Sequence, residues 1–307
     1  MKVLVTGVCG QLGHDVVNEL TKRGHEAIGS DITPVYSGAD DGTAVTCAPY
    51  VQMDINDADA VSRVLGETKP DTVVHCAAWT AVDAAEDNED RVRAINAGGT
   101  RHIAAACKVL DCKLMYISTD YVFDGQGETP WAPDCTDYAP LNVYGQTKLE
   151  GELAVRELVE RFFIVRIAWV FGLNGKNFIK TMLSLGQKHE CVRVVCDQIG
   201  TPTYTLDLAR LLVDMIETDR YGYYHATNEG GYISWADFAG EIFRQAGMPT
   251  KVVPVTTSAY GLSKAARPFN SRLDKRKLIE NGFEPLPTWQ DALSRYLREI
   301  GCTADKT

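Results

Sequence analysis

The chain has 307 residues, of which 45% are hydrophobic and 23% are charged, and its formal net charge is −10. This composition is typical of a globular protein with one large or two modest domains. The acidic balance argues against nucleic-acid binding, which needs basic surfaces, and no apolar run approaches the ~20 residues of a membrane span. The chain shows no signal peptide and no C-x-x-C pair among its nine cysteines. We therefore expect a cytoplasmic protein with reduced thiols.

The first half of the sequence alternates short apolar runs with helical patterns. We predict strands at 2–6, 25–31, near 51–54, 71–77, 113–118 and 162–167, and helices at 11–23, about 57–67, about 87–110 and 144–160. This alternation predicts a parallel sheet with helices on both faces. The near-continuous Val, Ile and Leu of the strands agrees, because both faces of such a sheet are covered.

The second half is less regular. We predict helices at 177–189, 206–217, 234–246 and 288–300, a strand at 192–196, and loops at 122–143 and 255–272, which are rich in Pro, Gly, Thr and Ser. The chain contains no internal repeat or obvious linker. A second domain would therefore be built from several returns of the chain.

A glycine-rich segment, GVCGQLG, joins the first predicted strand to the first predicted helix. Gly7, Gly10 and Gly13 permit a tight turn, close approach of the backbone to a pyrophosphate, and close helix–strand packing. The helix N-terminus offers its N–H groups to the phosphates. These features predict dinucleotide binding by a Rossmann-type doubly wound sheet. We assign residues 1–170, with a return near 197–222, to the dinucleotide-binding domain, and 171–307 mainly to a smaller, discontinuous substrate-binding domain.

Two carboxylates follow predicted strands near this loop. Asp31 lies 24 residues after Gly7, where it can accept a hydrogen bond from a ribose 2′-OH and would repel a 2′-phosphate. That placement favours NADH over NADPH, although Asp31 can also be a turn residue before Ile-Thr-Pro. Asp54 can approach the adenine or cap a helix, and Asn56 or Asp57 is a further candidate for that cap.

Three side chains predict the chemistry. The fifth strand ends in ISTDYVF, which places Thr119 at the carboxyl edge of the sheet, and the next helix begins with YGQTK. Tyr144 and Lys148 lie four residues apart, on one helix face. The phenol can protonate a ketone oxygen that has received hydride, the ammonium can lower the pKa of the phenol, and Thr119 can hold that oxygen.

These motifs resemble the extended short-chain dehydrogenase/reductase family, and more narrowly its subgroup that reduces dTDP-4-dehydrorhamnose. The resemblance runs almost end to end, through AAWTAVDAAE (77–86), PLNVYGQTKLEGE (140–152), RIAWVFG (166–172), NFIKTML (177–183), DQIGTPTY (197–204) and RPFNSRLD (267–274). It implies reduction of the 4-keto group of dTDP-4-dehydro-L-rhamnose, a nucleotide sugar, to dTDP-L-rhamnose.

The resemblance also implies roles for particular residues. Thr119, Tyr144 and Lys148 would be catalytic. The cofactor would contact Gly7, Gly10, Gln11, Leu12, Asp31, Asp54, Ile55, Ala77, Ala78 and Lys148. The substrate would contact Val82, Asp83, Tyr121, Trp169, Asn177, Gln198 and Arg267. Trp169, also a candidate cofactor contact, can instead be a core aromatic. Arg267 can instead pair with an acidic neighbour, although its planar fork suits a diphosphate.

The chain departs from the family pattern at Ala84, where the resemblance predicts a lysine between Asp83 and Ala85. Members of the subgroup use NADH, NADPH or both. Some are dimers joined through Mg²⁺ and carboxylates, so a homodimer is implied, but no clear Mg²⁺ ligand set stands out in this sequence.

Two other functions stay open. A nucleotide-sugar 4,6-dehydratase needs Asp-Glu after the threonine, whereas Tyr121 follows Asp120 here. No single residue excludes an epimerase, but the subgroup motifs do not favour one. The regulatory subunit of methionine adenosyltransferase resembles the same subgroup and binds a partner protein without catalysis. The short polar end of this chain, REIGCTADKT, does not favour that role.

Overall fold

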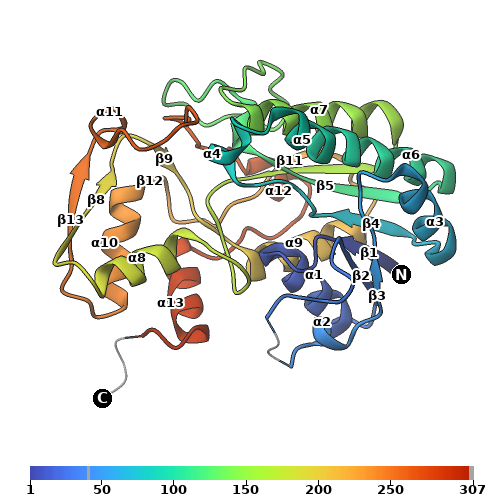
Figure 1. The fold of residues 1–307 in the computed structure, drawn as a ribbon, viewed down its shortest axis with the longest axis horizontal. Helices are drawn as coiled ribbons and strands as arrows, with labels where there is room; N and C mark the ends of the chain where they lie inside the picture. Colours follow the sequence, from blue (N-terminus) through green and yellow to red (C-terminus); the bar gives the residue numbers. More distant parts are fainter. Residues whose placement is uncertain (40–41, 304–307) are drawn as a thin grey trace.

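The computed structural model describes residues 1–39 and 42–303. Among them, seven parallel strands form the central sheet (Figure 1). Across the sheet these are β3 (Tyr50–Gln52), β2 (Glu26–Asp31), β1 (Lys2–Thr6), β4 (Thr72–His75), β5 (Lys113–Thr119), β6 (Phe162–Ile167) and β11 (Gly222–His225). The strand order reverses between β1 and β4, and open α/β sheets bind ligands at such a switch point. The predicted Rossmann-type fold is confirmed.

Helices cover both faces of the sheet (Figure 1). One face carries α1 (Gln11–Lys22), α2 (Ala44–Cys47), α9 (Thr205–Ile216) and α12 (Arg276–Glu280). The other carries α3 (Ala58–Thr68), α4 (Val82–Ala85), α5 (Glu89–Arg93), the π-helix η1 (Ala94–Gly99), α6 (Thr100–Leu110) and α7 (Val143–Leu158). A short 3₁₀ turn, η2 (Asp120–Val122), follows β5. The apolar strands therefore lie between two separate hydrophobic cores.

Side-chain caps set the starts of two helices that matter for the site. Asp57 accepts hydrogen bonds from the backbone N–H groups of Asp59 and Ala60 and so begins α3. Asn142 accepts one from Gly145 N at 2.8 Å and begins α7. Such caps satisfy N–H groups that have no partner within the helix.

The C-terminal part of the chain packs beside the sheet around a third core. Its helices are α8 (Phe178–Gly186), α10 (Trp235–Gln245), α11 (Thr257–Tyr260) and α13 (Trp289–Glu299). Three two-stranded pairings accompany them: β7 (Val170–Phe171) with β10 (Thr203–Tyr204), β9 (Ile199–Gly200) with β12 (Ile233–Ser234), and β8 (Cys191–Val195) with β13 (Lys251–Val255).

The structure differs from the predicted elements in several places. The helical region predicted at 87–110 is divided by the π-helix at 94–99. β11 extends the sheet at its edge, although no strand was predicted there. The predicted loop at 255–272 is wrong at its start, because it contains the last residue of β13 and all of α11.

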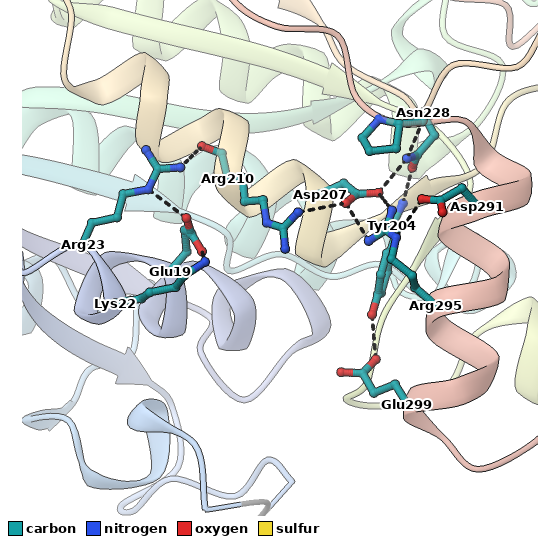
Figure 2. A network of polar contacts seen from close by, with 11 residues as sticks. Glu19, Lys22, Arg23, Tyr204, Asp207, Arg210, Asn228, Asp291, Arg295 and Glu299 are labelled. Carbon is teal, nitrogen blue, oxygen red and sulfur yellow. Dashed lines mark hydrogen bonds and ion pairs between the residues drawn. The ribbon is translucent and has the colours of Figure 1, made fainter.

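A polar network joins α9, on the sheet, to α13, in the C-terminal part (Figure 2). Asp207 is buried in α9 and accepts hydrogen bonds from Arg295 Nη1 at 2.9 Å and Nη2 at 2.6 Å. Asn228 Nδ2 donates to the same carboxylate at 2.8 Å. Nearby, the Tyr204 hydroxyl donates to Glu299 at 2.8 Å. The C-terminal part is therefore held to the sheet by a bidentate, charge-assisted pair.

Asp207→Asn should lower the free energy of unfolding by about 2 kcal/mol, measured by urea denaturation. The substitution removes the negative charge that pairs with Arg295. The new side-chain amide can also turn its own N–H group toward the N–H group of Asn228, which then has no acceptor. Asp291→Asn is the matched control, since Asp291 is an exposed partner of the same guanidinium. It should cost less than about 1 kcal/mol, and equal losses in the two variants would contradict the importance of Asp207.

Candidate active site

A cavity of about 710 Å³ opens where the central strands end. Its size is typical of a small-molecule or cofactor site. Most of the predicted site residues line it: Gly7, Gly10, Gln11, Leu12, Asp31, Asp54, Ile55, Ala77, Ala78, Val82, Thr119, Tyr121, Tyr144, Lys148 and Trp169. The residues that follow β1, β4, β5 and β6 thus meet at one edge of the sheet.

Close packing of the backbone requires glycine at two positions of the loop that borders this cavity. Gly7 has a φ of 72°, and a Cβ there would lie 2.7 Å from Ala77 N. A Cβ on Gly13 would collide with the carbonyl oxygen of Gly7. Gly10 begins α1 and brings no capping side chain to it. The first N–H groups of α1 can therefore bind a pyrophosphate, and the loop fits a dinucleotide.

Asp31 and Asp54 both reach the cavity from strand ends. Asp31 Oδ2 accepts a hydrogen bond from Cys9 N at 3.0 Å, and its Oδ1 accepts one from Ile32 N at 2.8 Å, so Asp31 ties β2 to the glycine loop. Asp54 Oδ1 accepts from Asn56 N at 2.9 Å. Because Asp57 caps α3, the alternative in which Asp54 caps that helix is wrong.

Thr119, Tyr144 and Lys148 line the same cavity. Thr119 is the last residue of β5, and the other two lie one turn apart near the start of α7. Lys148 Nζ donates to Ile117 O at 2.6 Å and lies 4.1 Å from the centroid of the Tyr116 ring. The carbonyl and the ring hold the ammonium group in one position.

Burial controls the charge states of this part of the cavity. It raises the pKa of Tyr144 above its usual range, although hydrogen bonding with Thr119 lowers it and the charge of Asp120 raises it further. Burial also lowers the pKa of Lys148 to about 7. We predicted that the ammonium lowers the phenol pKa. In the protein alone the pKa is raised instead, because the loss of hydration on burial is its largest cause and the other contributing groups are Thr119, Asp120 and Tyr121 rather than Lys148.

A buried ion pair fixes α7 against the sheet. Glu152 accepts hydrogen bonds from Arg166 Nε at 2.9 Å and Nη2 at 2.7 Å, and both side chains are fully buried. Ser118 Oγ, next to Thr119, donates to the same carboxylate at 2.5 Å. The pair therefore joins β6 to α7 and to the end of β5. Thr119 lies at the end of β5, and Tyr144 and Lys148 lie on α7.

Four predicted substrate residues lie outside the cavity lining. Asp83 and Arg267 bond to each other at 2.7 Å, and Arg267 Nη1 also donates to the Tyr121 hydroxyl at 3.3 Å. Gln198 is buried and donates to Thr257 Oγ1 at 3.0 Å. Asn177 caps α8, and its side-chain amide also donates to Gln11, Gly172 and Tyr296.

Sequence reasoning missed an aromatic partner in the cavity. Trp235, the first residue of α10, stacks on Trp169 with centroids 3.7 Å apart and ring planes 16° apart. Trp169 has a φ of 52°, in the left-handed region that bulky residues rarely adopt. The sequence around Trp235, SWAD (234–237), indicated only the start of a helix. Its contact with Trp169 could not be predicted, because the two residues are 66 positions apart in the chain. Asp120 and Lys176 also line the cavity without having been predicted.

Within 1–39 and 42–303, no group of three or more His, Cys, Asp or Glu side chains is placed to hold a metal ion. None of the helices in these ranges is long and apolar enough to cross a membrane.

Fold and site together define a Rossmann-type protein of the extended short-chain dehydrogenase/reductase class. The chain belongs to the family described as RmlD substrate binding domain, whose model matches residues 1–302.

Individual relatives agree with this assignment. The chain is 40% identical to a dTDP-4-dehydrorhamnose reductase of Streptomyces griseus, over 95% of this chain and 91% of that one. It is 36% identical to a dTDP-4-keto-6-deoxy-D-glucose reductase of Streptomyces niveus, over 95% of each. The crystal structure of dTDP-4-dehydrorhamnose reductase from Bacillus anthracis in complex with NADP superposes with a TM-score of 0.88 at 39% identity, covering 97% of this chain and 100% of that one.

Arg166→Met should lower the free energy of unfolding by about 3–5 kcal/mol in denaturant titrations, because Glu152 would stay buried without its cation. The double variant Glu152→Leu/Arg166→Met removes both charges and should regain much of that loss. A single variant as stable as the parent protein would show that the pair does not hold α7 in place.

Proposed function

We propose that this protein reduces the 4-keto group of dTDP-4-dehydro-L-rhamnose to give dTDP-L-rhamnose, with NADH or NADPH as the hydride donor. The observation that carries the proposal is that Thr119, Tyr144 and Lys148 line one cavity together with the glycine loop. The names of the 36–40% identical relatives support a 4-keto nucleotide sugar as the substrate.

In this proposal the three side chains divide the tasks of proton transfer, substrate positioning and cofactor binding. A bound reduced nicotinamide supplies the hydride to the ketone carbon. Tyr144 donates the proton to the ketone oxygen, and its raised pKa keeps the phenol protonated at neutral pH. The Thr119 hydroxyl positions that oxygen. Lys148, held by Ile117 O, is placed to bind the nicotinamide ribose and to support Tyr144 once it has lost its proton.

The substrate-side residues are proposed with the same logic. Val82, Tyr121 and Trp169 line the same cavity as the triad and would contact the sugar or the base. Arg267, next to Tyr121, carries the fork that suits a diphosphate, and binding would exchange its contact with Asp83 for one with phosphate. Asn177 and Gln198 would act through Gln11 and Thr257. Residues 171–307 would form most of the substrate-binding domain.

The cofactor proposal is that Asp31 favours NADH. The carboxylate stands at the cavity with one oxygen bonded to the glycine loop, and it can accept from a ribose hydroxyl. A relative that was solved in complex with NADP makes NADPH the direct competitor. A cytoplasmic homodimer completes the proposal, and Mg²⁺ has no proposed ligands.

A second candidate differs only in the sugar. The Streptomyces niveus relative is named as a reductase of dTDP-4-keto-6-deoxy-D-glucose, so reduction of that stereoisomer is the main competitor. Assays of NADH and NADPH oxidation with a panel of 4-keto nucleotide sugars separate the two. Oxidation with none of them would overturn the proposed function.

Tyr144→Phe should lower kcat by at least about 100-fold while cofactor binding persists, because the ring remains but the acid is lost. Cofactor consumption measures kcat, and quenching of tryptophan fluorescence measures binding. Tyr221→Phe is the matched control, since the Tyr221 hydroxyl donates to Asp219, outside the cavity lining. Full activity of Tyr144→Phe would rule out Tyr144 as the proton donor.

Asp31→Ala should reduce the preference for NADH over NADPH by about tenfold or more, because it removes a hydrogen bond between a charged group and the ribose hydroxyl. The readout is the ratio of kcat/KM for the two cofactors. Asp59→Ala, which removes an exposed carboxylate from the first turn of α3, should leave the ratio unchanged. If the ratio stays the same in Asp31→Ala as well, Asp31 does not read the ribose.

A further inference from the structure

Asp120 is a buried carboxylate in the cavity wall to which the proposed reaction assigns no role. It begins the 3₁₀ turn after β5 and is 2% exposed. Its Oδ1 accepts a hydrogen bond from Thr119 Oγ1 at 3.1 Å. Its Oδ2 is buried with no hydrogen-bond partner in the described part of the chain. Leaving a buried carboxylate oxygen unpaired is costly, so a group of this kind needs an explanation.

The groups that face Asp120 come from three elements. Thr119 and Tyr121 are its neighbours, Tyr144 faces it from α7, and the Ser271 hydroxyl lies close enough to lower the pKa of the carboxyl. None of these four is a cation, and Arg267 bonds to the hydroxyl of Tyr121 instead. Burial raises the pKa of Asp120 to about 6. The carboxyl can therefore carry a proton near neutral pH.

The hydroxyl of Thr119 has only one proton to give. Its oxygen already accepts from Tyr121 N at 3.2 Å, and its proton goes to Asp120 when that carboxylate is ionised. In that state Thr119 cannot donate toward Tyr144. A protonated Asp120 reverses the bond, because the acid then donates to Thr119 Oγ1 and the threonine proton is free to point at the phenol oxygen.

We propose that Asp120 is the positioning residue that stores the replacement proton for Tyr144 and delivers it through the hydroxyl of Thr119. The inference rests on the proposed function and deepens it. Tyr144 would then be the acid that protonates the substrate, and Asp120 would be the acid that reprotonates Tyr144 through Thr119.

The steps balance in atoms and charge. Hydride from the reduced nicotinamide forms a C–H bond at the ketone carbon, which reduces the ketone and oxidises the cofactor. The Tyr144 O–H bond breaks as its proton joins the substrate oxygen. Once the ketone oxygen has become a hydroxyl, the Thr119 proton turns from that oxygen to the phenolate, which takes it, and Thr119 takes the carboxyl proton of Asp120. Asp120 is left as a carboxylate, which regains one proton from water after product leaves the open cavity.

The test compares the pH profile of kcat for Asp120→Asn with that of the parent enzyme. Asparagine keeps the shape and can donate to Thr119, but it has no proton to release. The parent kcat should fall as pH rises through the pKa of Asp120, because the acid form is the active one. In Asp120→Asn, kcat should be about tenfold or more lower at pH 6, and the fall centred on the pKa of Asp120 should be missing from its profile, whereas any change due to Lys148, whose pKa is about 7, should remain. Unchanged kcat and an unchanged profile would overturn the inference.

Asp124→Asn is the matched control. Asp124 lies four residues further on, outside the cavity lining, and accepts from Gln126 N. Its variant should keep the parent profile. Substrate KM and cofactor binding should stay within about twofold in Asp120→Asn. Thermal unfolding at the same pH values separates loss of a proton carrier from loss of folded protein.

A measurement without substrate keeps this inference distinct from the proposed function. Infrared difference spectra of the parent protein between pH 5 and pH 8 should contain a protonated-carboxyl band that Asp120→Asn lacks. Absence of that band overturns the proton store even if the enzyme reduces the sugar. Presence of the band in a protein that reduces no 4-keto nucleotide sugar would leave the store in place and overturn the proposed function alone.

Discussion

The geometry of the site depends on one buried interaction, the pair between Glu152 and Arg166. It fixes the rotation and height of α7, because Glu152 lies one turn after Lys148 and two turns after Tyr144 on the same helix face. The bond from Ser118 to the same carboxylate joins the end of β5 to this frame. Two elements distant in sequence thus present their side chains to one point, and a shift of either would separate hydroxyl from phenol.

The same burial determines the electrical character of the cavity wall. Loss of hydration favours the neutral form of each titratable group, so it raises the pKa of Tyr144 and Asp120 and lowers that of Lys148. Close to neutral pH these residues therefore comprise a neutral phenol, a carboxyl that is protonated in part and a partly charged base, in the same cavity as a loop shaped for phosphates. Such perturbed groups gather where proton transfer is carried out.

The sequence predicted the parts of the site that follow from local pattern and sheet topology. The glycine loop, the strand ends and the i, i+4 spacing of Tyr144 and Lys148 were sufficient to bring those residues to one edge. It could not predict contacts between distant segments. Arg267 pairs with Asp83, 184 positions earlier in the chain. Ala84 stands where the family resemblance predicts a lysine, and the positive charges next to it come instead from Lys264, which pairs with Asp87, and from Arg267. β13 was hidden by Pro254, because proline within an apolar run argues against a strand.

The central claim is that Tyr144 and Thr119 face the reacting oxygen of a sugar. A crystal structure of the protein with the oxidised cofactor and dTDP-L-rhamnose tests this most directly. The account predicts the sugar 4-oxygen within about 2.6–3.2 Å of both Tyr144 Oη and Thr119 Oγ1, with the nicotinamide ring against the adjacent carbon. A sugar bound with its 4-oxygen turned away from Tyr144, or outside this cavity, would contradict it.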